Sequence, residues 1–451
     1  MSRIITKGMP AVFMAAAVCL ACAPPGTAAE TAPTRSEEAV AAAETLTLAD
    51  AVSLALERSP ALAAFSFDVR VAEAQEIQAR LRPNPEVSAE IEDIGLDGGH
   101  SGFSEAEFTV SLSQLVELGG KRVRRMQLAA REKDVAAWDY EIARADVLKE
   151  VAGTFAELLS AQAKVQLDDE SVQLAGQVLE TVSARAEAGR VSPLEVARAR
   201  TARSLSEIQA VRSKKGLDTA RTRLASLWGD RMARFGRAQG DLDAVMDIPP
   251  LEQLVNRAAG NPDLARWQAE TERRRTAISV EKAAAVSDLT VSFGGRATGV
   301  EEPGGGPHDW DHSLLLGVSV PLPLFNRNQG AIRAAEHLLA KAGEERRAED
   351  IRVNTELAAA HQDLTAALSA VAALRKDILP AATEIYESVN EAYRQGKFGY
   401  LDVLDAQRTL FEARQQHLDA LAGYHGKIAD IERLIGQSLW DAPDSALPTG
   451  D

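Results

Sequence analysis

Four short segments of the chain carry apolar residues at every second position, with small or polar residues between them. Alternation of this kind, with one apolar face, is typical of β-strands. The pattern therefore predicts four strands in two hairpins, with the apolar positions Val87, Ala89 and Ile91; Phe108, Val110 and Leu112; Leu289, Val291 and Phe293; and Leu314, Leu316, Val318 and Val320.

Longer stretches carry apolar residues at steps of three and four, which is typical of helices packed in coiled-coil seams. From Arg122 to Ala188 hardly a residue breaks the pattern, which at about 1.5 Å per residue predicts a helix roughly 100 Å long. A short helix should begin at Thr47, with Asp50 completing a capping box, and Pro380 should kink a later helix. The expected seam positions are Leu148, Val151, Phe155, Leu158, Val172, Ala175, Leu179, Val182, Ala186, Leu364, Leu368, Val371, Leu374 and Ile378.

The chain also resembles itself at a shift of 207 residues. Upstream the shift is 202, because the second copy carries a loop rich in Gly and Pro from Gly299 to Asp311, which we expect at an exposed tip. We predict a first repeat over 46–240, a second over 247–439 and a tail over 440–451. The paired positions are Gly189 and Gly396, Leu194 and Leu401, Val196 and Val403, Ala199 and Ala406, Leu227 and Leu434, and Gly229 and Gly436.

Each repeat contains a glycine motif at which the long helix should turn back on itself. In the first repeat Gly189 ends one helix, and Ser192 is the expected N-cap of the next, with Glu195 closing a capping box. In the second repeat Gly396 ends the helix and Gly399 is the expected cap. Both motifs predict tight helical hairpins with small, exposed tips.

The N-terminus has the layout of a secretory signal, with basic residues, an apolar run from Ala11 to Ala23, and then small residues and prolines. We predict a signal over 1–29 and a linker over 30–45, with either cleavage after Ala29 or acylation of Cys22 in a lipobox-like context. Both cysteines, Cys19 and Cys22, lie in this leader, so packing alone must hold the mature chain together.

Composition and charge exclude several functions. A net charge of −16 without a sustained Lys/Arg run argues against nucleic acid binding. The charge suits a duct for cations, although exposed helix faces alone would account for it. No catalytic constellation emerges, so we predict no enzyme and no cofactor; the histidines His337, His361, His417 and His425 lie singly on helical patterns.

Two motifs resemble ligand sites. The segment from Gly119 to Arg122 lacks the spacing of a phosphate-binding loop and is interpreted as a strand-to-helix turn. His308 and His312 flank two aspartates, as metal ligands would, but the Gly-rich loop around them favours a solvated surface. We therefore predict no metal site.

Four strands with an apolar face cannot stand alone in lipid, because their edges would leave backbone groups unpaired. Three chains would supply about twelve strands, within the range of bacterial barrels. The predicted fold is mixed but mostly α: a trimeric transmembrane β-barrel with four strands per chain, continued by a long antiparallel coiled-coil periplasmic tunnel. Phe103, Trp310 and Phe325 are expected in an interfacial belt. A periplasmic coiled-coil scaffold is the alternative from a different class.

This layout resembles the TolC-type outer-membrane factors of tripartite efflux pumps, from Leu46 to about Leu439. The segments Arg82 to Glu86, Ser113 to Arg122 and Pro321 to Gly330 resemble the cobalt-zinc-cadmium and copper-silver branch of that family. The resemblance implies a homotrimer in outer-membrane lipid, fed by a periplasmic adaptor and an inner-membrane pump of the resistance-nodulation-division (RND) class, that passively exports heavy-metal cations. A duct of the same fold for drugs or secreted proteins is the alternative.

The resemblance also implies roles for the hairpin tips. Related ducts carry acids around a narrow periplasmic mouth, and the matching positions here are Asp402 and Asp405, with Glu195 ranked third. Asp402 and Glu195 occupy the third helical position, where an acid also serves capping. The place of a basic latch partner is taken by Phe398. Adaptor docking is expected at Gly189, Arg190, Ser192, Leu194, Gly396, Lys397, Gly399 and Leu401.

Overall fold

The computed structural model describes residues 45–95, 105–300 and 309–439. The chain divides into the units Met1–Ala43 and Glu44–Asp451, and every described residue belongs to the second. The predicted signal with Cys22, Phe103, His308 and the tail over 440–451 lie outside the described residues. Within the described part most residues are helical, as the sequence predicts.

The described part begins with strand β1 (Thr45–Thr47), which pairs in parallel with β4 (Arg237–Gln239) and leads into α1 (Leu48–Arg58). The predicted capping box is confirmed, since the Thr47 N–H donates to Asp50 Oδ2 at 3.0 Å and the Asp50 N–H donates to Thr47 Oγ1 at 3.2 Å. The Thr47 hydroxyl also donates to Asp50 Oδ2 at 2.6 Å, and this bond, together with the bond from the Thr47 N–H, lowers the pKa of Asp50.

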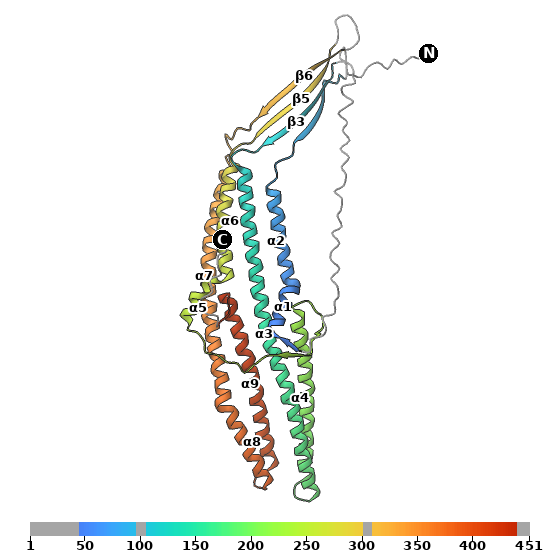
Figure 1. Ribbon diagram of the computed structural model, residues 1–451, viewed down its shortest axis with the longest axis vertical. Coiled ribbons are helices and arrows are strands. Elements are labelled where there is room, and N and C mark those ends of the chain that lie inside the picture. The colour runs from blue at the N-terminus through green and yellow to red at the C-terminus, as the bar shows by residue number, and fades with distance from the viewer. Residues whose placement is uncertain (1–44, 96–104, 301–308, 440–451) are drawn as a thin grey trace, which may run out of the picture. The chain divides into compact units, whose positions relative to one another are not determined.

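Four strands form one antiparallel sheet in the order β2-β3-β5-β6, in which the labelled strands β3, β5 and β6 lie side by side in Figure 1. All four predicted strands are confirmed, but the expected loop from Gly299 to Asp311 is too long, because Gly299 pairs with Trp310 and Val300 with Asp309. Within the described residues, β2 and β6 each have one neighbouring strand, so both are edges. The strands are β2 (Glu86–Glu92), β3 (Glu107–Val116), β5 (Leu289–Val300) and β6 (Asp309–Ser319).

Long helices continue from the strands. Near the sheet α3 packs against α2 and α6, and α6 against α7; further along, α3 packs against α4 and α9, and α9 against α7 and α8 (Figure 1). The long helices are α2 (Pro60–Ala79), α3 (Lys121–Glu187), α4 (Pro193–Ser226), α6 (Pro262–Ala284), α7 (Gln329–Ala373), α8 (Leu379–Arg394) and α9 (Tyr400–Ile435). Short α5 (Leu251–Arg257) and a 3₁₀ turn (Ala258–Gly260) precede α6. Helix α3 confirms the predicted long helix. It packs against helices near the sheet and also against helices further along.

The predicted seams are buried for the most part, with Val151, Leu158 and Leu364 fully enclosed. Ile378 is the exception, because its side chain is 45% exposed and its assignment to a seam is wrong. It ends a π-helical turn, Leu374–Ile378, two residues before Pro380. Proline lacks a backbone donor, and the wider turn that accommodates it changes the register of the seam.

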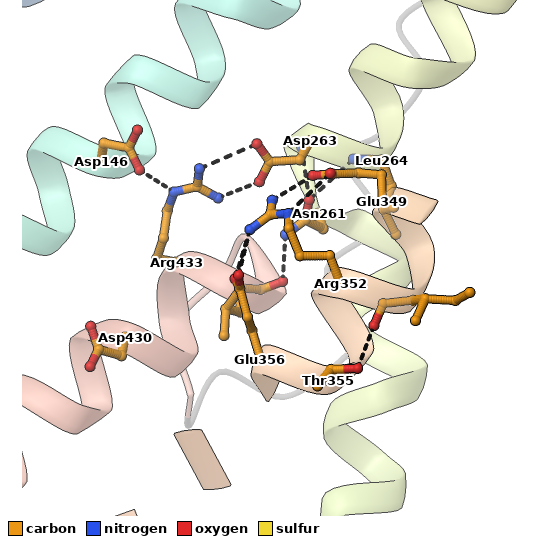
Figure 2. A network of polar contacts seen from close by, with 12 residues as sticks. Asp146, Asn261, Asp263, Leu264, Glu349, Arg352, Thr355, Glu356, Asp430 and Arg433 are labelled. Carbon is orange, nitrogen blue, oxygen red and sulfur yellow. Dashed lines mark hydrogen bonds and ion pairs between the residues drawn. The ribbon is translucent and has the colours of Figure 1, made fainter. Parts of the chain in front are cut away.

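Ion pairs tie the end of α9 to the start of α6 and to the middle of α3. Arg433 on α9 reaches Asp146 on α3 at 2.5 Å and Asp263 on α6 at 2.7 Å (Figure 2). Burial alone would lower the pKa of Arg433, but the hydrogen bonds to both carboxylates raise it. Asn261 caps α6 and donates from Nδ2 to the Leu434 carbonyl at 2.8 Å. The three helices are therefore fixed at one level.

Candidate functional site

The first hairpin tip joins α3 to α4. Gly189 has a left-handed φ of 67°, and the next N–H, of Arg190, donates to the Arg185 carbonyl at 2.8 Å. Ser192 Oγ accepts from the Leu194 N–H at 3.2 Å, which confirms the predicted N-cap. The predicted capping box is wrong, because Glu195 Oε2 is a buried atom without a hydrogen-bond partner. The charge of Glu195 instead adds, after burial and Tyr393, to the raised pKa of Tyr400 in the second hairpin.

The second tip joins α8 to α9 with a similar turn. Gly396 has a φ of 77°, and the Lys397 N–H donates to the Ala392 carbonyl at 2.9 Å. Gly399 is the N-cap of α9, as predicted, and its N–H donates to Asp402 Oδ2 at 2.9 Å. Asp402 therefore serves capping whatever else it does. Across the two tips the side chains of Leu194, Phe398 and Leu401 are more than half exposed.

The three predicted mouth acids fall into two environments. Asp402 and Asp405 are exposed on α9, three residues apart, so they share one helix face. Glu412 pairs with Arg408 at 2.6 Å and raises the pKa of that arginine, and the Asp405 carboxylate adds a smaller rise. Glu195 is half-buried on α4. A mouth lined by these acids remains a prediction for all three.

A contact between the two hairpins escaped the sequence analysis. The Arg185 guanidinium on α3 lies 4.5 Å from the ring centroid of Tyr393 on α8 and donates to the carbonyls of Tyr393 and Arg394 at 3.1 and 2.9 Å. Tyr393 and Tyr400 are buried beside each other, and burial raises the pKa of Tyr400 to about 12, with smaller contributions from Tyr393 and Glu195. Arg185 and Tyr393 are 208 residues apart, and neither belongs to a recognisable motif.

The sheet has one apolar and one polar face. Cross-strand pairing places Val87, Leu112, Phe293 and Leu316 in one row on what we call the apolar face. All four side chains are exposed, from 48% for Leu112 to 83% for Leu316. A soluble domain would bury such a row, so this face must meet an apolar medium or partner.

The opposite, polar face carries small and charged side chains. Ser88 and Ser111 share a hydrogen bond of 2.8 Å across β2 and β3. A Cβ at Gly294 would lie 2.6 Å from the Val110 carbonyl oxygen, so this crowded position requires glycine. Arg296 pairs with Glu107 at 2.6 Å. Alternation of an apolar and a polar face is the pattern of a membrane barrel, with lipid on one side and water on the other.

The structure also tests the two sequence motifs that resemble ligand sites. Gly119 and Gly120 both have positive φ and connect β3 to α3, which confirms the predicted strand-to-helix turn. His312 lies in β6 on the face opposite Asp309 and Asp311, so the described part of the suggested metal cluster does not converge. Among residues 45–95, 105–300 and 309–439 no group of three His, Cys, Asp or Glu residues is placed to hold a metal.

Three helical histidines that looked solitary in sequence converge on one crossing segment, 242–249. His361 Nε2 donates to the Pro249 carbonyl at 3.2 Å, and His425 Nε2 donates to the Leu242 carbonyl at 2.9 Å. His417 lies 3.5 Å from Asp243. These rings hold the connection between the two halves of the chain and need no ligand.

Long helical hairpins joined to a four-stranded sheet with an exposed apolar face define the fold of outer-membrane efflux channels. The crystal structure of CusC aligns with a TM-score of 0.72 at 18% identity, over 87% of this chain and 92% of CusC. The outer-membrane channel OprN aligns with a TM-score of 0.70 at 18% identity, over 87% of this chain and 90% of OprN.

The chain belongs to the outer membrane efflux protein family, whose model matches residues 51–230 and 254–437. The cobalt-zinc-cadmium resistance protein CzcC of Cupriavidus metallidurans is 33% identical over 88% of this chain and 91% of its own length. The pyoverdine export outer membrane protein OpmQ of Pseudomonas putida is 27% identical over 87% and 86%. The protein is thus an outer-membrane channel that reaches into the periplasm, and its family is one of transport ducts.

Proposed function

We propose that the chain is the outer-membrane duct of a tripartite pump that exports heavy-metal cations. An inner-membrane RND pump would supply the energy, and a periplasmic adaptor would connect it to the duct. The similarity to CzcC, whose name states cobalt, zinc and cadmium resistance, supports this cargo. The duct itself needs no catalytic group, since it only completes the path outward.

The observation that carries the proposal is the two-faced sheet with two open edges. Leu314, Leu316 and Val318 on edge strand β6 are 79%, 83% and 71% exposed, which suits lipid contact. An open edge in lipid would leave backbone groups unpaired, so β6 of one chain must find β2 of another. Closure by three chains gives about twelve strands, a homotrimeric barrel within the bacterial range.

We further propose the domain organisation expected from the sequence. A signal over 1–29, acylated at Cys22 or cleaved after Ala29, and a linker over 30–45 precede repeats over 46–240 and 247–439 and the tail over 440–451. The matching glycine turns of the two tips support the repeat, since Gly189 and Gly396 have the same left-handed backbone conformation.

The tips supply the remaining roles in this proposal. The exposed Leu194 and Leu401, beside the glycine turns, suit docking of the adaptor, together with Arg190, Ser192, Lys397 and Gly399. The exposed carboxylates of Asp402 and Asp405 suit a pore mouth that attracts cations. Glu195 is the weakest member of that set, because it is half-buried.

Growth of a strain lacking the gene tests the cargo. We expect increased sensitivity to zinc, cobalt, cadmium or copper, unchanged sensitivity to organic antibiotics, and full rescue by the wild-type gene. Sensitivity to antibiotics alone would support the alternative, a duct for drugs or secreted proteins. The similarity to the pyoverdine export protein OpmQ is the observation that favours this alternative. Fractionation of the protein away from the outer membrane would support a periplasmic scaffold instead.

Cysteine crosslinking tests the trimer. Both native cysteines lie in the predicted leader, so introduced thiols can be read cleanly. Cysteines placed in turn at Val87, Ala89 or Ile91 on β2, combined with Leu316→Cys on β6, should yield a crosslinked trimer for one register. The control replaces the β6 position by Val291→Cys on inner strand β5, which should give no intermolecular product. A monomer throughout the series would overturn the proposed closure.

A further inference from the structure

Each strand of the sheet is joined to a helix by a short connection. The connections are residues 80–85 before β2, 117–120 after β3, 285–288 before β5 and 320–328 after β6. Together with the helical turns beside them, 121–125, 282–284 and 329–333, we call these residues the junction. The junction therefore marks the level at which the sheet gives way to the helices.

Unpaired positive charge gathers at the junction. Arg82, Arg124, Arg327 and Arg333 are exposed, and within the described residues none of them has a carboxylate partner. Exposed Lys282 adds a cation to the connection before β5, so all four connections are represented. This accumulation contrasts with a net charge of −16 for the whole chain.

Three carboxylates at the junction already contact other groups. Glu117 pairs with Arg125 at 2.6 Å, and Asp288 pairs with Lys121 at 2.7 Å. The Asn328 side chain donates to Glu281 Oε2 at 2.7 Å. Arg124 donates to Gln127 Oε1 and Arg327 to the Pro323 carbonyl, both neutral acceptors, so these guanidinium groups keep their charge for an external anion.

Large apolar side chains flank the same cations. Leu81 precedes Arg82 and is 52% exposed, and Val123 precedes Arg124 and is 54% exposed. In the connection after β6, Leu322, Leu324 and Phe325 are 74%, 63% and 90% exposed, next to Arg327. Adjacent apolar and cationic side chains suit the boundary between acyl chains and headgroups, where an arginine keeps its charge at the surface.

We propose that the junction binds the phosphate groups of anionic phospholipids in the periplasm-facing leaflet of the outer membrane. The inference rests on the proposed function, since it takes the apolar face of the sheet to span the bilayer and the helices to extend into the periplasm. That arrangement puts the junction at the headgroups of the inner leaflet. A guanidinium donates two parallel hydrogen bonds to phosphate oxygens, a geometry that an ammonium cannot match.

Lipid binding by the purified full-length protein tests the proposal. Native mass spectrometry would count bound phosphatidylglycerol and phosphatidylethanolamine at equal concentrations in mild detergent. A basic side chain near an anionic surface contributes about fivefold in affinity, so wild type should prefer phosphatidylglycerol by roughly fivefold or more. The preference should shrink at high salt, because the interaction is electrostatic.

The variant Arg82→Gln with Arg124→Gln and Arg327→Gln should bind both lipids to within about twofold. Its matched control, Arg212→Gln with Arg346→Gln and Arg347→Gln, removes three exposed arginines from α4 and α7 away from the junction and should retain the preference. Loss of the preference for phosphatidylglycerol in both variants, or in neither variant, would overturn the proposal. So would a wild-type protein without preference.

The outcomes separate this inference from the proposed function. A protein that fails to form a membrane-inserted trimer contradicts the proposed duct. A trimer that inserts normally but does not distinguish the two lipids contradicts only the lipid contact. Competition by free glycerol phosphate at millimolar concentration would assign the arginines to soluble anions and also overturn the proposal.

Discussion

The two hairpin tips have nearly the same backbone but place their acids differently. In both, a left-handed glycine lets the following N–H return to a carbonyl of the helix just ended, at 2.8 Å in the first tip and 2.9 Å in the second. The first tip is then capped by the Ser192 hydroxyl, and its acid, Glu195, turns toward the buried tyrosines. In the second tip Gly399 has no side chain, and Asp402 Oδ2 accepts from the Gly399 N–H.

This difference shows why position in a repeat does not decide function. Glu195 and Asp402 occupy equivalent third positions of their helices. Asp402 accepts from the N–H of its N-cap, whereas Glu195 does not, although an acid can do so beside an N-cap hydroxyl, as Asp50 does beside Thr47. Asp405, one turn further along α9, has no capping task and stays exposed. Of the three acids, Asp405 is therefore the one whose presence helix capping and packing explain least.

The largest effect is expected from the shared glycines. Gly189→Val or Gly396→Val puts a β-branched residue at positive φ, which costs about 1–2 kcal/mol at each turn and should distort the tip. We expect metal resistance to be lost while the amount of protein in the outer membrane is unchanged. Gly216→Val on α4, where a Cβ has open space, is the control and should keep resistance. Full resistance in both tip variants would contradict the docking role.

The second prediction separates charge from capping at the second tip. Asp402→Asn with Asp405→Asn removes two charges per chain but keeps a side-chain oxygen to accept from the Gly399 N–H. If these acids line the mouth, the cation-to-anion permeability ratio in a planar bilayer should fall, by roughly twofold or more. Removing two exposed acids from α7, in Glu336→Ala with Glu344→Ala, should leave the ratio unchanged. An unchanged ratio in the Asn variant would make both aspartates ordinary helix-start residues.

A smaller effect is expected from the cap of the first tip. Ser192→Ala removes the acceptor for the Leu194 N–H and should destabilise the start of α4 by about 1 kcal/mol. Hydrogen exchange of the α4 amides measures this local effect without unfolding the whole assembly. Ser192→Asp restores an acceptor and should return exchange to the wild-type rate. Equal exchange in Ser192→Ala and wild type would show that the Oγ contact contributes nothing.

The smallest effect concerns Glu195. Because Tyr400 has a pKa raised to about 12 from 10.0, chiefly by burial, its neutral form stabilises the tip below pH 10, and this contribution is lost as the pH rises toward 12. Glu195→Gln removes a negative charge that disfavours tyrosinate, so the pKa of Tyr400 should fall slightly. Ultraviolet absorbance during alkaline titration measures the change, with Tyr400→Phe identifying the signal. A large change in channel selectivity in Glu195→Gln would instead support a place for Glu195 in the lining of the pore mouth.

Sequence patterns predicted the elements of the fold better than the contacts between them. Alternation located all four strands, and spacing located α3 to within one residue at either end, because these periods follow from backbone geometry. The capping role of Glu195 and the seam position of Ile378 were predicted wrongly, because Glu195 lies near the buried Tyr400 and Ile378 ends a π-helical turn. No period in the sequence encodes a pair such as Arg185 and Tyr393, which tertiary packing alone brings together.

The two open edges of the sheet have a genetic consequence. In the proposed trimer, a chain whose β2 or β6 edge cannot pair would interrupt every ring that it enters, since a ring closes only when all its edges match. In a cell that makes equal amounts of wild-type and edge-defective chains, only about one trimer in eight would contain wild-type chains alone. Edge lesions should therefore be dominant. Lesions that prevent secretion or folding remove their chains before assembly and should be recessive.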